Sequence, residues 1–177
     1  FNSPSGITTD GTNLYVTDNG NHRIRKIVIA TGAVTTLAGS SQGSADGTGT
    51  SARFNSPRGI TTDGNNLYVA EFSNHMIRKI VISTGEVTTL AGSTSYGSTD
   101  GTGTWSTFNG PMGIGIDGTN LYVADYNNHK IRKLDLRGTV TADVKLHNLD
   151  DDTNATINLA SSDTGEATVS PATLTFK

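Results

Sequence analysis

The sequence predicts an all-β protein made of one small unit repeated in tandem. The segment that begins at Phe1 returns at Phe54 and Phe108, with periods of 53 and 54 residues. The first two copies agree at 30 of 39 positions, and the first and third agree at 18 of 26. Self-similarity at such a period is typical of stacked supersecondary units. Residues that recur in every copy are therefore expected to serve the scaffold, and positions that differ are better candidates for function.

Short apolar runs separated by turn residues predict four antiparallel strands in each copy. Asp10-Gly11 is a predicted hairpin turn, because glycine accepts the positive φ of tight hairpins, and the pair recurs at Asp63-Gly64 and Asp117-Gly118. In the first copy the predicted strands are residues 6–9, 13–17, 24–29 and 34–37, followed by a long Gly/Ser/Thr loop over 40–53. A sheet of four short strands cannot bury both faces alone, so the units must stack, as the blades of a β-propeller do.

The recurring residues closely resemble the NHL repeat, which is named for an Asn-His-Leu signature. The resemblance covers residues from Phe1 to about Arg137, and in the three copies Arg23, Met76 and Lys130 replace the leucine. It implies propeller blades, most often six to a ring, and a scaffold that binds proteins, RNA or glycans. Related six-bladed propellers also include metal-dependent hydrolases and lyases. The first copy carries the pattern as Pro4-x-Gly6-Ile7, Asp10-Gly11, Leu14-Tyr15-Val16-x-Asp18 and Asn21-His22-x-Ile24-Arg25-Lys26.

The repeat pattern divides the chain into blades and a tail. The predicted blades are residues 1–53, 54–107 and 108–137, and residues 138–177 are predicted to be a linker with β-sandwich-like strands. The formal charge changes at the same place, from +1 up to Lys133 to −4 beyond it. The string SSDTGEATVSPATLTF resembles the opening hairpin of a bacterial surface repeat of the immunoglobulin-like or Calx-β-like kind, although a complete sandwich needs about 100 residues.

The amino-acid composition argues against several classes of protein. The net charge of −3 gives no reason to expect a polyanionic partner, and the absence of cysteine excludes disulfides and thiol catalysis. The sequence has no run of 18 apolar residues that could span a membrane. The abundance of Thr, Ser, Asn and Gly favours an extracellular or cell-surface protein of bacterial origin.

Repeated polar residues are assigned to the scaffold. A catalytic centre usually needs each group once, whereas one histidine recurs at the same position of every copy. We expect each to hydrogen-bond within its own blade to the acid four residues earlier, which predicts a structural network of Asp18, His22, Glu71, His75, Asp125 and His129. The repeated Arg-Lys pairs that begin at Arg25, Arg78 and Arg132 are expected on the solvated faces of strands, so nucleic-acid binding is not expected.

Positions that vary between copies are the predicted binding residues. Arg58 and Met112 occupy the slot just before the first strand of their copies, where the first copy has a serine. Phe72, Tyr126 and Asn127 lie in the exposed turn before each Asn-His pair, and Trp105 lies in the second long connector. Exposed aromatic residues that are free to vary indicate contact with a partner.

No catalytic constellation is found, and no cofactor is expected except a possible Ca²⁺. The candidate ligands for that ion are Asp150, Asp151 and Asp152. The sequence therefore predicts a non-enzymatic extracellular scaffold that presents a propeller surface for protein or glycan recognition and that self-associates. Its partners would be further copies of itself or the missing blades of a longer parent chain. The alternatives are a filament subunit built by blade stacking and strand addition, and a six-bladed hydrolase or lyase with a channel metal.

Overall fold

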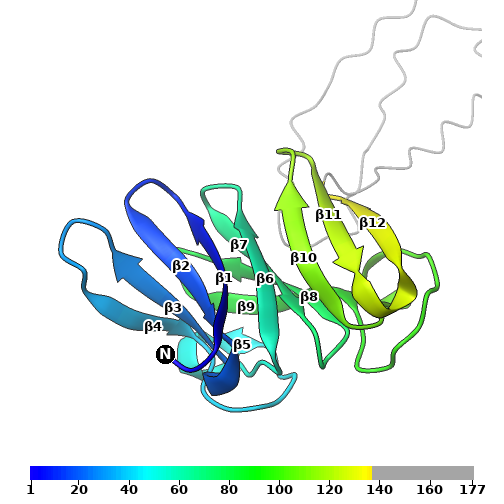
Figure 1. Ribbon diagram of the computed structural model, residues 1–177, viewed down its shortest axis with the longest axis horizontal. Coiled ribbons are helices and arrows are strands. Elements are labelled where there is room, and N and C mark those ends of the chain that lie inside the picture. The colour runs from blue at the N-terminus through cyan, green and yellow to red at the C-terminus, as the bar shows by residue number, and fades with distance from the viewer. Residues whose placement is uncertain (137–177) are drawn as a thin grey trace, which may run out of the picture. The chain divides into compact units, whose positions relative to one another are not determined.

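A computed structural model describes residues 1–136, which fold into three antiparallel β-sheets, so the predicted all-β class is confirmed (Figure 1). Each sheet is built mainly from one sequence repeat, whose first strand begins at the Pro-x-Gly segment. The predicted C-terminal β-rich segment and the aspartates of the possible Ca²⁺ site lie outside the described residues.

The first sheet has the order β1-β2-β3-β4, and the third has the order β10-β11-β12. The second sheet has five strands, in the order β5-β9-β8-β7-β6. The bounds are β1 Pro4–Thr9, β2 Asn13–Asp18, β3 Arg23–Val28, β4 Val34–Ala38, β5 Gly47–Thr48, β6 Pro57–Thr62, β7 Asn66–Glu71, β8 Met76–Val81, β9 Glu86–Gly92, β10 Pro111–Ile116, β11 Asn120–Asp125 and β12 Lys130–Asp135. Four short 3₁₀ helices lie in the turns and connectors: η1 Asn19–Asn21, η2 Gly49–Ser51, η3 Gly103–Trp105 and η4 Tyr126–Asn128.

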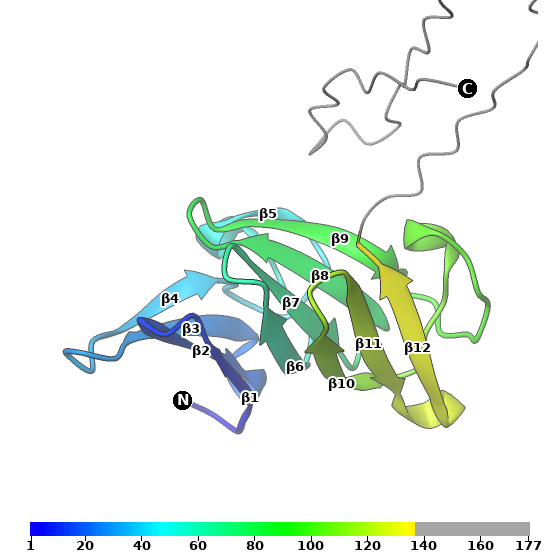
Figure 2. The same ribbon diagram turned by 90° about the horizontal axis from the view of Figure 1, so that it is seen from above.

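The second sheet corrects the prediction of four strands per copy. Its additional strand, β5, comes from the connector that was predicted as a loop, and it pairs antiparallel with β9 at the outer edge (Figure 2). The Gly49 N–H then donates to the Gly85 carbonyl at 2.9 Å. Pairing occurs because the edge of β9 offers unpaired backbone groups that a passing extended segment can satisfy.

The apolar core lies between the first two sheets. Tyr15, Ile24 and Ala38 of the first sheet pack with Leu67 and Ile80 of the second, and all are fully buried. Burial of one face of each sheet against the next is the arrangement that the repeat predicts, because a single sheet leaves that face in water.

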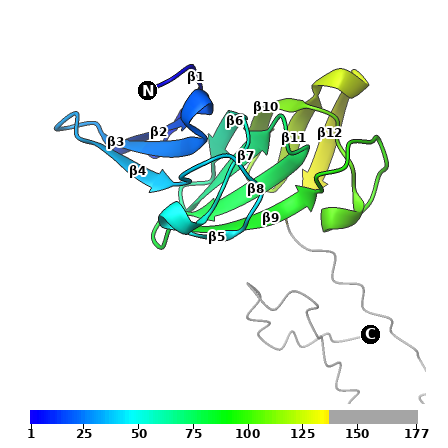
Figure 3. The same cartoon turned by 90° about the horizontal axis from the view of Figure 1, so that it is seen from below.

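The first strands of the three repeats, β1, β6 and β10, lie in succession along one side of the sheets (Figure 3). Their approach is set by one glycine in each copy. A Cβ atom on Gly6 would lie 2.3 Å from the Arg58 carbonyl oxygen, and one on Gly59 would lie 2.1 Å from that of Met112. Only glycine permits this separation, which explains the glycine of the Pro-x-Gly segment.

Residues Phe1–Leu134, which hold the three sheets except the last residue of β12, form one compact unit. The predicted linker and tail over 138–177 lie outside the described residues, so their structure remains a prediction.

Gly6→Ala and Gly59→Ala are each expected to lower the free energy of unfolding by about 1–3 kcal/mol, because the added methyl group must push neighbouring strands apart. Urea unfolding monitored by circular dichroism measures this loss. Gly115→Ala is the control, because a Cβ there meets no heavy atom within 4 Å. Equal losses in all three variants would contradict the close-approach explanation.

Candidate binding surface

A buried carboxylate lies at the centre of the polar interactions in each sheet. In the second sheet, Glu71 accepts hydrogen bonds from the Asn55 N–H at 2.7 Å, the Asn74 amide at 2.9 Å and the Arg78 guanidinium at 2.7 Å. Both Glu71 and Arg78 have fully buried side chains. One carboxylate therefore joins the end of β7, the following turn, β8 and the residue after Phe54.

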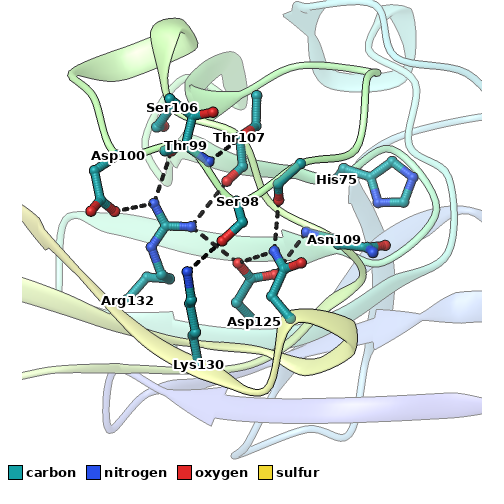
Figure 4. Close-up of polar contacts among 12 residues, drawn as sticks. His75, Ser98, Thr99, Asp100, Ser106, Thr107, Asn109, Asp125, Lys130 and Arg132 are labelled. Atoms are coloured by element: carbon teal, nitrogen blue, oxygen red, sulfur yellow. Dashed lines mark hydrogen bonds and ion pairs between the residues drawn. The ribbon is translucent and has the colours of Figure 1, made fainter.

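The same arrangement recurs in the other two sheets. Asp125 accepts from the Asn109 N–H at 2.7 Å, the Asn128 amide at 2.8 Å and Arg132 at 3.1 Å (Figure 4). Asp18 accepts from the Asn2 N–H, from the Asn21 amide and, at 3.3 Å, from Arg25. The predicted structural role of the repeated acids is consistent with these contacts, although their partners are asparagine and arginine rather than histidine.

The repeated arginines also hold the connectors between sheets. Arg78 donates to the carbonyl of Ala45 at 3.1 Å and to the carboxylate of Asp46 at 2.6 Å. Arg132 makes the equivalent bonds to Thr99 at 3.0 Å and Asp100 at 2.6 Å (Figure 4). Arg78 and Arg132 are therefore buried and ion-paired. The expectation that they lie on solvated strand faces is wrong, because the connector folds over them.

Burial and hydrogen bonding oppose one another at these acids. Burial raises the pKa of the Glu71 carboxyl above its ordinary value, against the opposing charge of Arg78. At Asp18 burial alone would raise the pKa, but the N–H donors of Asn2, Asn21 and Arg25 together hold it below its ordinary value. Asp18 and Glu71 therefore each accept several hydrogen bonds from within the protein.

The histidines bond to the next sheet rather than to the acid of their own. His75 Nδ1 accepts the backbone N–H of Gly110 at 3.0 Å, and His22 Nδ1 accepts that of Ser56 at 3.3 Å. The prediction that each histidine bonds to the acid four residues earlier is therefore wrong, because His22 and His75 bond to backbone N–H groups of the next repeat. The left-handed backbone, with φ of 58° at His75, turns each ring toward the following repeat. His129 shares this backbone conformation at the same position of the third sheet.

Four of the six predicted binding residues come together beside β6 and β10. The Arg58 guanidinium lies 4.0 Å from the centre of the Phe72 ring, and its Nη1 lies 3.7 Å from the sulfur of Met112. A Cβ atom on Gly110 would touch both Phe72 and the Asn127 amide, so Asn127 borders the same area. We call Arg58, Phe72, Met112 and Asn127 the Arg58 platform.

The other two predicted residues are both exposed. Tyr126 adjoins Asn127 in the chain, and its side chain is 58% exposed. Trp105 is 83% exposed and lies on η3, a connector helix that packs against β9. Trp105 shares no described contact with the Arg58 platform, so the structure gives no reason to treat it as part of that surface.

Two hydroxyl groups fix the backbone of the Arg58 platform, and sequence reasoning missed one of them. The Arg58 carbonyl accepts from the Thr17 hydroxyl at 2.7 Å and from the Ser5 hydroxyl at 3.2 Å. Position 17 differs between copies, with alanine at 70 and 124, and this variation was the available signal. Among residues 1–136, no group of three or more His, Asp or Glu side chains is placed to hold a metal ion.

Comparison with known proteins identifies the repeat. Residues 1–27 match the family model described as NHL repeat. The chain is 39% identical to NHL repeat-containing protein 2 of Bos taurus and 38% identical to that of Homo sapiens, in each case over 153 aligned residues and 77% of this chain. The sheets are NHL-type propeller blades. The chain spans only 21% of the length of these relatives.

Solved structures agree on the architecture of these NHL blades. A protein of unknown function from Bacteroides thetaiotaomicron is 31% identical, with a TM-score of 0.63 over 68% of this chain and 32% of its own. An auxiliary nutrient binding protein from Bacteroides ovatus is 29% identical, with a TM-score of 0.61 over 70% of this chain and 34% of its own. The predicted immunoglobulin-like resemblance of the tail receives no support from these matches.

The predicted extracellular, bacterial-surface location is wrong. The curated relatives include NHL repeat-containing protein 2 of three eukaryotes, and these are not bacterial surface proteins. The composition misled the prediction because Thr, Ser, Asn and Gly are the residues that turns and short strands require, in any compartment. Within residues 1–136, no helix has the length and hydropathy needed to cross a membrane.

Arg78→Met is expected to lower the free energy of unfolding by about 3–5 kcal/mol, because it leaves the Glu71 carboxylate buried without its cation. Arg25→Met, the same change in the first blade, is expected to cost only about 1 kcal/mol, because the Arg25–Asp18 pair is longer and its arginine is partly exposed. Chemical denaturation of both variants measures the difference. A smaller loss in Arg78→Met than in Arg25→Met would contradict the assigned role of the buried pair.

His75 is expected to make stability depend on pH. Burial lowers the pKa of His75 below its ordinary value of 6.5, with the Asp125 charge partly opposing this. Below about pH 6.5 the unfolded chain therefore binds the proton more strongly, and stability is lost as the pH falls. We expect the free energy of unfolding to decrease between about pH 7 and pH 5, with a smaller decrease in His75→Gly, which keeps the left-handed backbone. An undiminished decrease in His75→Gly, equal to that in His129→Gly, would show that another group is responsible.

At neutral pH, His75→Ala is expected to lower the free energy of unfolding by about 1–3 kcal/mol, because the Gly110 N–H loses its acceptor. Thermal or urea unfolding at pH 7.5 measures the loss, and a variant as stable as the wild-type chain would contradict the assigned bond.

Proposed function

We propose that this chain is a non-enzymatic protein-interaction scaffold whose two outer blades each dock a further NHL blade. The observation that carries the proposal is a change in exposure at equivalent positions. Ile24 and Ile77 are fully buried, whereas Ile131 of the third blade is 72% exposed. Apolar side chains of this size, exposed together on one sheet face, mark an interface.

The exposed face of the third blade repeats the chemistry of the two junctions inside the chain. Tyr122 lies on the same face as Ile131, and the equivalent Tyr15 and Tyr68 are buried. Gly113 occupies the position at which Gly6 and Gly59 approach the carbonyl of the following blade, and a Cβ there would meet nothing closer than 3.5 Å. The third blade therefore presents a surface matched to the strand that begins another blade.

The first blade presents the complementary surface. Ile7 is 62% exposed, whereas the equivalent Ile60 is 7% exposed beneath the first blade. Arg25 donates to Asp18 and to the carbonyl of Thr35, whereas its equivalents hold the aspartate of a connector. A second copy of this chain, or further blades of a longer protein, would supply both the apolar cover and the connector.

The contact between blades is heterologous, since two different surfaces meet. Repeated about a closing rotation it makes a ring, and otherwise it makes an open chain of blades. The similarity to an auxiliary nutrient binding protein supports a binding role over a catalytic one. Protein rather than glycan recognition is favoured, because the exposed Ile7, Tyr122 and Ile131 are apolar and their equivalents are buried where the blades inside this chain meet.

Sedimentation is expected to show that the chain self-associates at micromolar concentration. Gly113→Ala is expected to weaken this association by at least about tenfold, because its methyl group would collide with the incoming carbonyl, and to leave the stability of the blades unchanged. Gly115→Thr is the matched control on the same strand, because Thr8 and Thr61 occupy the equivalent position in the internal junctions.

A single folded species of 18.5 kDa at these concentrations would overturn the proposal. So would equal association of the wild-type chain and the Gly113→Ala variant. Ring and filament are distinguished by mass, since a ring reaches a limiting mass and a filament continues to grow with concentration.

A further inference from the structure

The structure assigns a second binding site, independent of the open blade faces, to the Arg58 platform. We propose that the Arg58 guanidinium binds the carboxylate of an acidic peptide segment of a partner protein. Met112, Phe72 and the neighbouring Tyr126 would contact the apolar residues that flank the acid.

Arg58 has no ion-pair partner in the part of the chain that the structure describes. Three of the five other arginines of the blades, Arg25, Arg78 and Arg132, are each paired with a buried carboxylate. Arg58 has no carboxylate partner among residues 1–136, and its contacts there are the sulfur of Met112 and the face of Phe72. The charge of Arg58 therefore lacks a counter-charge, which an incoming carboxylate would supply.

The guanidinium is held against an aromatic ring. Its carbon lies 4.0 Å from the centre of the Phe72 ring, and this cation–π contact restrains the group. A carboxylate can accept a charge-assisted hydrogen bond from a guanidinium held in this way. The backbone beneath is fixed as well, because the Ser5 and Thr17 hydroxyls of the first blade both donate to the Arg58 carbonyl. The site is therefore organised before any ligand arrives.

A single carboxylate fits this surface better than a polyanion does. His75, in the turn after β7, uses Nδ1 as a hydrogen-bond acceptor, so its ring adds no positive charge. The side chains that border Arg58 are uncharged: Phe72, Met112 and Asn127. A polyanion such as RNA needs several cations along its backbone, whereas one guanidinium in an apolar and amide setting fits one carboxylate. The equivalent positions in the first and third blades hold Ser5 and Met112, so this cation occurs once in the described blades.

Peptide arrays test the proposal directly. The probes are degenerate pentapeptides with a fixed central aspartate, asparagine or phosphoserine, and a single-stranded oligouridine is the polyanion control. The labelled protein is expected to bind the aspartate pool at least about tenfold more tightly than the asparagine pool, the effect of one charge-assisted pair. This preference is expected to vanish in Arg58→Met, a change that copies Met112 of the third blade and should therefore fold.

Arg53→Met is the matched control, because it removes one positive charge at an exposed connector position outside the platform. It is expected to keep the aspartate preference. A second readout is the Arg58 Nε–H nuclear magnetic resonance signal, which sodium acetate should shift in a saturable manner and sodium chloride of equal ionic strength should not.

Several results would overturn the assignment. They are an equal affinity for the aspartate and asparagine pools, a preference unchanged in Arg58→Met, tighter binding of the oligouridine, and an Arg58 signal indifferent to acetate. Because Gly113→Ala leaves the Arg58 platform intact, a loss of self-association with retained peptide binding separates this site from the open blade faces.

Discussion

The structure depends on the packing of each blade against the next. A four-stranded sheet of this length has two faces and too little of its own chain to cover them. The first two blades cover each other through Tyr15 and Ile24 on one side and Leu67 and Ile80 on the other. This burial is available only at a fixed spacing, which Gly6 and Gly59 set by admitting the carbonyl of the neighbouring strand. The polar interactions of the blades keep this spacing fixed.

Polar interactions at one end of the sheets stabilise the packing of the blades. A carboxylate at the end of each second strand binds the turn, the third strand and the entry to the blade. In the second and third blades the arginine of the third strand also bonds the connector. In the second blade Glu71 replaces aspartate, and its longer side chain makes a shorter bond to arginine, 2.7 Å compared with 3.3 Å in the first blade. The histidine then joins the finished turn to the following blade. A short stretch of sequence thus encodes both the closure of one blade and its attachment to the next.

The sequence predicted those features that depend on local pattern. Strands, hairpin turns and the count of repeats follow from apolar periodicity and from turn residues such as Asp10-Gly11, and the strands begin and end close to the predicted positions. It failed where a residue acts at a distance. The partner of His75 is 35 residues away, and Arg78 reaches a connector 32 or 33 residues earlier, so neither could be assigned by spacing within one copy. The grouping of Arg58 with Phe72 and Met112 was expected only in that all three vary between copies, and their contact required the fold. The predicted location was wrong for a different reason. The abundance of Thr, Ser, Asn and Gly reflects the turns and short strands of the fold rather than the compartment of the protein.

The short strand β5 makes the boundaries of the second blade differ from the boundaries of its repeat. The connector that precedes the innermost strand β6 also forms β5 on the outermost strand β9. One continuous stretch of chain, residues 47–62, therefore forms both edge strands of the second sheet, β5 at one edge and β6 at the other. The strands of that blade cannot fray one at a time from the outside, because releasing β9 first requires removing a segment fixed at the inner margin. The blade should therefore open as a single cooperative unit, whereas the first sheet, whose margins are the separate strands β1 and β4, can lose its outer strand alone.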